Sequence, residues 1–147
     1  MPERLELEIT ETLFYGDEPA VRRELTTLKE MGVRIAMDDF GTGYSSLSLL
    51  SSFPFDKIKI DRAFIKDIGR KRASAAILRS VAALGLDLGI VTTAEGVETR
   101  EQLEAVRREG CTEVQGFFFS PPVSDDRVVA CIKACAERTA IHSSSRN

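Results

Sequence analysis

Histidine, cysteine and long apolar runs are scarce in this sequence, and each scarcity excludes a class of protein. The one histidine, His142, lies in a polar stretch, and the three cysteines lack the spacing of a disulfide framework, so no zinc site is expected. Cys131 and Cys135 lie four residues apart and are predicted to be small core-facing residues of one helix. No segment approaches the roughly 20 apolar residues that a membrane-spanning helix needs.

Positive charge is not in excess either. The sequence has 20 Lys and Arg against 23 Asp and Glu, which gives a net charge of −3. This balance does not suit the phosphate backbone of DNA or RNA, so no nucleic-acid partner is expected. The first residues, MPERLELEITE, lack the apolar core of a signal peptide. With 43% hydrophobic residues in 147, the composition predicts one soluble domain in the cytoplasm.

Strand-like and helix-like segments alternate along the chain. Strands are predicted at residues 5–10, 33–40, 57–61, 88–96 and 111–119, and helices at 17–32, within 41–52, and at 71–85, 99–109 and 126–138. Asp17 is the expected N-cap of the first helix, Gly85 the expected stop of the third, and Thr99 with Gln102 an expected capping box. This order predicts an α/β fold whose strands form a parallel sheet covered by helices.

Polar side chains gather where the predicted strands end. The five strands carry, in order, Glu8 and Glu11, Asp38 and Asp39, Lys59 and Asp61, Glu95, and Gln115. Because the carboxyl ends of parallel strands form one rim of an α/β fold, these groups are expected to meet in one site. Two adjacent aspartates at the end of a buried strand also need a cation, a hydrogen-bond cage or a substrate to offset their charge.

This set of groups suits phosphodiester chemistry with a divalent metal. Carboxylate and amide oxygens are ligands that Mg²⁺ and Mn²⁺ prefer, and a metal pair can clamp phosphodiester oxygens and activate a bridging water. Lys59 would hold that water or stabilise developing charge, and Gln115 would orient water or substrate. Gly41 and Gly43 would let the loop after the aspartates turn tightly and bring N–H groups near an anion.

Each of these residues also has a structural interpretation. Glu8 would be a solvent-facing residue of an edge strand, and the aspartate pair would cap the following helix. Gln115 and Gly43 would be ordinary structural and turn residues. Because Lys57 and Lys59 alternate in one strand, one of them would be a surface lysine. The coincidence of polar groups at five successive strand ends favours the functional site.

Five segments resemble the EAL-domain family, bacterial phosphodiesterases that hydrolyse cyclic di-GMP to the linear dinucleotide. They are LELEITE, MDDFGTGYSSL, FDKIKIDRAFI, TAEGVET and QGFFFSPPV, in the family's order and approximate spacing between Leu5 and Val123. The resemblance implies a partial TIM-like (βα) barrel of about five parallel strands, a Mg²⁺ or Mn²⁺ cofactor and cyclic di-GMP as substrate. Residues 1–138 would be the carboxy-terminal portion of such a domain, and residues 139–147 a disordered polar tail.

The resemblance also implies individual roles. Glu8, Asp38 and Asp39 match metal ligands, and Glu95 matches a carboxylate at the same centre. Lys59 matches the lysine that holds the attacking water, and Gln115 matches an amide near that water. Glu11 matches a glutamate that steadies the loop containing Gly41 and Gly43. In the family this loop lies between the metals and the dimer interface, so it would couple association to activity.

Some family features are not among these 147 residues. They are the Glu-Ala-Leu triplet with its ligand glutamate, an asparagine ligand and an arginine that follows the triplet. A complete barrel has ~250 residues, so roughly three strands are unaccounted for. The expected consequences are two open strand edges, an exposed apolar barrel interior and a metal that lacks two ligands. We therefore expect this chain to be a very weak enzyme alone, and to close its barrel in a homodimer or with the missing amino-terminal half.

Two other functions compete with a phosphodiesterase. The chain would be a catalytically inactive module in cyclic di-GMP signalling that binds nucleotide at the rim or a protein at its open edge. Alternatively, Lys59 would form a Schiff base in a metal-dependent lyase or aldolase. The unbroken series of family segments weighs against the second of these.

Overall fold

Five parallel strands form the centre of the fold, which confirms the α/β class. A computed structural model of the protein describes residues 1–41 and 47–143. The strands are β1 (Glu6–Thr10), β2 (Arg34–Phe40), β3 (Lys57–Ile60), β4 (Val91–Ala94) and β5 (Glu113–Val114). They lie in the order β1-β2-β3-β4-β5, and every neighbouring pair is parallel. Strands that keep their sequence order in a parallel sheet are the wall of a (βα) barrel.

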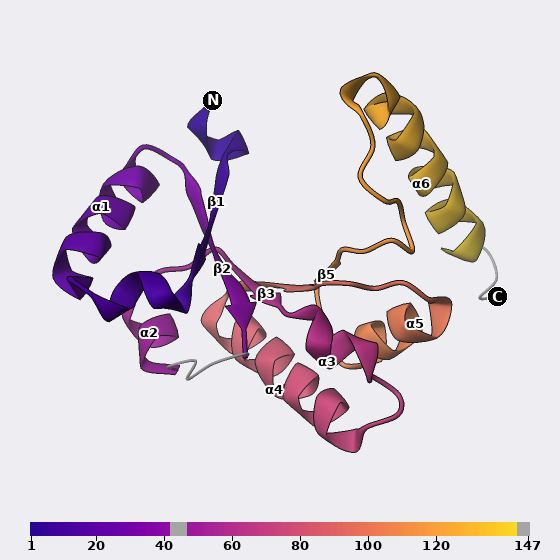
Figure 1. The fold of residues 1–147 in the computed structure, drawn as a ribbon, viewed down its shortest axis with the longest axis horizontal. Helices are drawn as coiled ribbons and strands as arrows, with labels where there is room; N and C mark the ends of the chain where they lie inside the picture. The colour runs from indigo at the N-terminus through magenta and orange to yellow at the C-terminus, as the bar shows by residue number, and fades with distance from the viewer. Residues whose placement is uncertain (42–46, 144–147) are drawn as a thin grey trace.

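Helices connect and cover these strands. The α-helices are α1 (Glu18–Glu30), α2 (Leu47–Ser52), α3 (Arg62–Lys66), α4 (Arg72–Leu88), α5 (Arg100–Arg108) and α6 (Val128–Ser143), and the short 3₁₀ helices are η1 (Pro2–Arg4), η2 (Glu11–Tyr15) and η3 (Asp125–Arg127). Figure 1 shows α1 to α5 around the strands, with α6 standing apart from them. None of the helices in the described ranges is long and apolar enough to cross a membrane.

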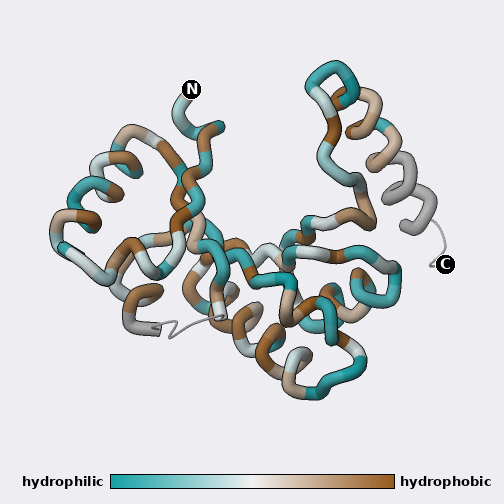
Figure 2. The backbone as a smooth tube through the Cα atoms, viewed as in Figure 1, coloured by the Kyte–Doolittle hydropathy of each residue, from teal (hydrophilic) through white to brown (hydrophobic). Residues whose placement is uncertain are grey.

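The hydrophobic core lies on the helix-facing side of the sheet. Ile35 of β2 and Ile58 and Ile60 of β3 are fully buried, in one cluster with Leu78 of α4. Polar and apolar residues alternate around the turns of α1 and α4 (Figure 2), so each helix places its apolar side on this cluster.

The opposite face of the sheet is charged. Glu6 and Glu8 of β1 contact Lys57 and Lys59 of β3. Successive residues of a strand point to opposite faces, so residues two apart share a face. The expected apolar barrel interior is therefore wrong for these strands: their inner face carries ion pairs, while the apolar residues lie under the helices.

The predicted helix caps at Asp17 and Thr99 are confirmed, whereas the predicted end of α4 at Gly85 is wrong. Asp17 caps α1 by accepting a hydrogen bond from the backbone N–H of Ala20 at 3.0 Å, and Thr99 and Gln102 form a capping box at α5. Helix α4 continues past Gly85 to Leu88, where Gly89 takes the left-handed conformation of a C-cap. Gly85 instead lets α4 approach β4, since a Cβ there would lie 2.4 Å from a methyl group of Thr92.

The carboxy-terminal elements differ from the prediction in length. Strand β5 has only two residues, because the chain turns after Gln115 and Phe119 donates a backbone hydrogen bond to Gly116 at 3.1 Å. Helix α6 ends at Ser143 rather than at Arg138, so residues 139–143, expected in a disordered tail, are helical.

Candidate active site

Lys59 is the centre of the predicted site. Its ammonium lies 2.6 Å from Glu8 Oε2, 2.8 Å from Glu95 Oε1 and 3.3 Å from Asp38 Oδ1. Lys59 belongs to β3, Glu8 to β1 and Asp38 to β2, and Glu95 directly follows β4. The strand ends therefore converge, as the sequence predicts. The side chain of Lys59 is only 7% exposed. Glu8 is a partly solvent-facing residue of the edge strand β1, with 47% of its side chain exposed, yet both it and Asp38 contact this buried cation.

The charge of Lys59 is stabilised by its partners. Burial opposes the charged form, but hydrogen bonds to Glu8 and Glu95 and the charges of Glu95 and Asp38 outweigh it and raise the pKa of Lys59 well above its usual range. Lys59 is thus a permanent cation at neutral pH. It can donate hydrogen bonds and stabilise negative charge, but it cannot accept a proton as a general base.

The aspartate pair lies at an irregularity of β2. The pairing of β2 with β3 changes register between Met37 and Phe40, and Asp39 has a positive φ of 54°. Such values are uncommon outside glycine and mark a bulge, which re-aims side chains at the end of a strand. Asp38 accepts a hydrogen bond from the backbone N–H of Asp39 at 3.0 Å and also reaches Lys59, while Asp39 is exposed.

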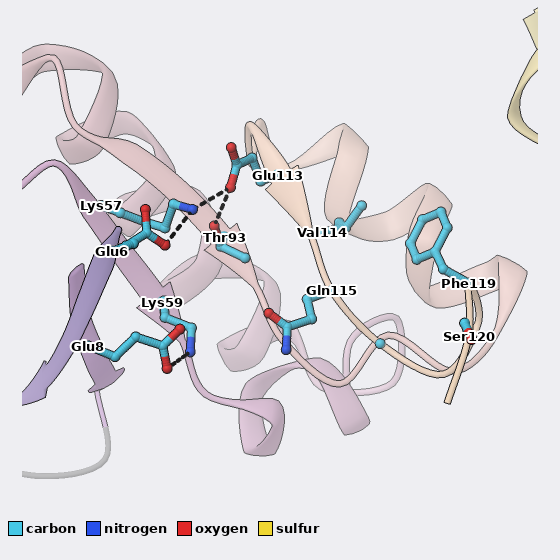
Figure 3. A pocket seen from close by; sticks show the side chains of 11 residues that line it. Glu6, Glu8, Lys57, Lys59, Thr93, Glu113, Val114, Gln115, Phe119 and Ser120 are labelled. Atoms are coloured by element: carbon cyan, nitrogen blue, oxygen red, sulfur yellow. Dashed lines mark hydrogen bonds and ion pairs between the residues drawn. The ribbon is translucent and has the colours of Figure 1, made fainter. Parts of the chain in front are cut away.

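Gln115 lies in the same pocket as Glu8 and Lys59. The pocket has a volume of about 350 Å³, and Phe119 and Ser120 close its other side (Figure 3). The backbone holds Gln115 from two directions, because its N–H donates to Ala94 at 2.9 Å and its carbonyl accepts from Val97 at 3.1 Å. The backbone of Gln115 is therefore fixed at the rim by β4 and by the loop that follows β4.

Gly116 permits this close approach, and Gly116→Ala is expected to destabilise the chain by about 2 kcal/mol. A Cβ at Gly116 would lie 2.1 Å from the oxygen and 2.4 Å from the nitrogen of Val97, which are backbone atoms that cannot rotate away. Urea denaturation would measure the loss. Gly69→Ala is the matched control, since Gly69 also has a positive φ, of 86°, but a Cβ there meets no atom within 4 Å. Equal midpoints for the two variants would contradict the close-approach argument.

The residues predicted to support the loop are only partly described. Glu11 is the first residue of η2, directly after β1, and Gly41 has a φ of 96°. A Cβ at Gly41 would lie 2.9 Å from the ring of Phe64, so both space and backbone conformation require glycine there. Gly43 lies outside the described residues, and the role of Glu11 toward that loop stays a prediction.

Sequence reasoning missed a second ion cluster beside the first. Lys57 lies 2.9 Å from Glu6 and 2.9 Å from Glu113, and its side chain is only 12% exposed. Burial opposes its charge, but the hydrogen bonds that Lys57 donates to Glu113 and Glu6 outweigh burial and raise the pKa of Lys57. The expectation that one lysine of the pair is a surface residue is wrong. Because Lys57 and Lys59 lie two apart in one strand, their spacing already indicated a shared face.

The side chains around Lys59 carry the type of ligand atom that binds a hard divalent cation. Glu8, Asp38 and Glu95 offer carboxylate oxygens, the ligands that Mg²⁺ and Mn²⁺ prefer. Among the described residues, however, no group of three acidic, histidine or cysteine side chains is arranged to hold a metal by itself. The three carboxylates instead surround an ammonium, so the site already concentrates negative charge on one cation.

Known proteins share this sequence and fold. The EAL domain family model matches residues 1–122. The chain is 54% identical over 125 residues to an uncharacterized signaling protein of Caulobacter vibrioides, a match that covers 85% of this chain and 16% of that protein. It is 42% identical over 131 residues to the bifunctional diguanylate cyclase/cyclic di-GMP phosphodiesterase MucR of Pseudomonas aeruginosa, covering 89% and 19% respectively. The chain thus spans less than a fifth of these curated relatives.

Solved structures agree with this match. The PaMucR phosphodiesterase in complex with c-di-GMP superposes with a TM-score of 0.80 at 42% identity, over 86% of this chain and 51% of that chain. The manganese/cy-diGMP complex of Klebsiella pneumoniae BlrP1 gives a TM-score of 0.78 at 42% identity, over 82% and 31%. The five-stranded wall therefore corresponds to part of an EAL TIM-like barrel, and the chain belongs to the EAL domain family.

Proposed function

We propose that this chain is the carboxy-terminal portion of a metal-dependent phosphodiesterase that hydrolyses cyclic di-GMP to the linear dinucleotide. The observation that carries the proposal is the convergence of Glu8, Asp38 and Glu95 on Lys59 at one rim of the sheet. The similarity to structures that contain cyclic di-GMP, one of them with manganese, supports this substrate and a divalent cofactor.

Each residue has a role in this proposal. Glu8, Asp38, Asp39 and Glu95 would hold Mg²⁺ or Mn²⁺, which when bound neutralises phosphodiester oxygens and acidifies bound water. Lys59 donates hydrogen bonds to the attacking water and stabilises charge that develops at phosphorus. The proton of the water passes to a carboxylate, and Glu95 is the best-buried of the three around Lys59, with 19% of its side chain exposed.

The amide and the loop complete the site. Gln115 orients water or substrate from the opposite side of the pocket. Glu11, Gly41 and Gly43 support the loop that follows the aspartates. The ion pairs of Lys59 with Glu8, Asp38 and Glu95 also argue against an aldolase, because Schiff-base formation needs a neutral amine.

The proposed activity belongs to a closed barrel. This chain covers about half of the PaMucR phosphodiesterase chain, at 51%. The outer sides of β1 and β5 have no strand partner among the described residues. Closure by a second copy or by the other half of the barrel would supply the remaining strands, and we expect very weak hydrolysis without it. The cytoplasmic location inferred from the sequence stays a prediction.

A second candidate is an inactive module that binds cyclic di-GMP or a protein partner. The observation that favours it is the ion pairing of three carboxylates to Lys59, which leaves no ready-made group of metal ligands in the described part of the chain. In this case the pocket beside Gln115 would retain the nucleotide without cleaving it.

A chimera tests the proposal. The part of the PaMucR EAL domain that precedes its matched segment is fused to the 147-residue chain, and production of linear dinucleotide from cyclic di-GMP is followed with Mn²⁺. We expect steady turnover by the chimera and little by the chain alone. Tight binding without turnover would favour the inactive module. Neither binding nor turnover by a folded chimera would reject both the phosphodiesterase and a module that binds cyclic di-GMP.

A further inference from the structure

The inner face of the sheet carries its polar side chains in two levels. The lower level consists of Glu6, Lys57, Thr93 and Glu113, and the upper level of Glu8, Lys59, Glu95 and Gln115. Each upper residue follows a lower residue by two positions on the same segment, so the two share a face. Figure 3 shows Lys57 of the lower level between Glu6 and Glu113. In this view the upper level, with Glu8, Lys59 and Gln115, is drawn beneath them.

Lys57 joins the first and last strands of the sheet. It belongs to β3, yet its ammonium lies 2.9 Å from Glu6 of β1 and 2.9 Å from Glu113 of β5. In a flat sheet β1 and β5 would lie about 19 Å apart, four spacings of about 4.8 Å. A lysine in the middle strand would then lean toward one edge or the other. It reaches both because the sheet is curved and the side chains of its inner face converge.

The contacts at this level are sheltered at Lys57 and Glu6, whereas the side chain of Glu113 is 48% exposed. The side chains of Lys57 and Glu6 are 12% and 18% exposed, and Glu113 also accepts a hydrogen bond from Thr93 at 3.0 Å. Without Lys57, Glu113 would lose its ion pair with the lysine and Glu6 would keep its ion pair with Arg34 at 3.3 Å. The remaining repulsion between the two carboxylates would drive β1 and β5 apart.

We propose that Lys57 is a positioning residue, which holds β1 and the segment 113–115 at the separation that brings Glu8 and Gln115 to Lys59. Glu8 follows Glu6 by two residues and Gln115 follows Glu113 by two, so any change of separation at the lower level moves the upper level. The consequence for metal binding rests on the proposed function, whereas the control of strand separation does not.

The separation can be measured directly by double electron–electron resonance. Spin labels are attached to cysteines at two exposed sites beside the end strands, Leu5→Cys and Phe117→Cys, in the full chain with its three native cysteines replaced by alanine. We expect Lys57→Met to lengthen and broaden the distance distribution by up to about 5 Å, one strand spacing. Lys57→Arg keeps the charge and should restore the original distance.

Lys29→Met is the matched control. Lys29 is also partly buried, with 22% of its side chain exposed, and pairs with Asp56 at 2.6 Å before β3 begins. The control variant therefore loses one partly buried ion pair that lies away from the inner face of the sheet. The distance distribution between its spin labels should stay unchanged. If Lys57→Met does not fold, Glu113→Gln removes only the β5 arm of the contact and should lengthen the distance in the same direction.

Binding of Mn²⁺, measured by the electron paramagnetic resonance of the free ion, tests the effect on the upper level. We expect Lys57→Met to weaken Mn²⁺ binding about tenfold and Lys29→Met to leave it unchanged. An unchanged distance in Lys57→Met, or equal Mn²⁺ affinities in the two variants, would overturn the proposal. A parent chain that binds no Mn²⁺ would count against the proposed function, and the distance measurement would still decide the role of Lys57.

Discussion

Lys59→Met is expected to destabilise the metal-free chain by about 3 kcal/mol, because it leaves three carboxylates without their shared cation. Glu8, Asp38 and Glu95 all lie within 3.3 Å of the Lys59 ammonium, and the side chain of Lys59 is 7% exposed. Methionine fills nearly the same volume as lysine, so the loss of stability reports the missing charge rather than a cavity. Chemical denaturation in the presence of a chelator measures it.

Added Mn²⁺ should reverse much of this loss. A divalent cation can take the place of the ammonium among carboxylates that no longer bind lysine, and a ligand at 100 times its Kd stabilises a folded protein by about 2.7 kcal/mol. We therefore expect Mn²⁺ to raise the melting temperature of Lys59→Met more than that of the parent chain. Lys29→Met, which breaks a single pair with Asp56, should lose only about 1 kcal/mol and gain nothing extra from Mn²⁺.

Two results would contradict this account of Lys59. A loss below that of Lys29→Met would mean that the carboxylates reorganise into solvent without cost. Equal stabilisation of parent and variant by Mn²⁺ would mean that the three carboxylates do not form the cation site.

In the chimera, Glu95→Gln is expected to lower kcat/KM for cyclic di-GMP about a thousandfold, which corresponds to about 4 kcal/mol of transition-state stabilisation. Glu95 directly follows β4, and its backbone N–H donates to Ile60 at 3.1 Å, so the change to an amide leaves the strand end in place. The amide keeps the shape of the side chain but removes the charge that would hold the metal and the proton acceptor proposed for the water.

The matched control is Glu104→Gln on α5, which makes the same change of charge at an exposed side chain that pairs with Arg100 at 3.4 Å. Its kcat/KM should stay within about twofold of the parent, in line with the small contribution of exposed ion pairs. Full activity of Glu95→Gln would remove Glu95 from the mechanism, and equal losses in both variants would point to misfolding.

Local sequence patterns predict the order of the five strands and of the longer helices, and the group of residues at the rim, but they missed the short helix α3. Period-two and helical patterns, with the caps at Asp17 and Thr99, depend on neighbours only a few residues apart, so they can be read locally. The convergence of Glu8, Asp38 and Glu95 followed from one general rule, that parallel strands present their carboxyl ends at a common edge.

Features that depend on distant segments could not be predicted from local patterns. Gly85 lies inside α4 because it packs closely against Thr92 of β4, and the two-residue β5 depends on the turn that Gly116 makes against Val97. The meeting of Lys57 with Glu113 depends on the curvature of the whole sheet, which accumulates over five strands. No local pattern reports such curvature, because it arises from strand twist and helix packing summed across the sheet.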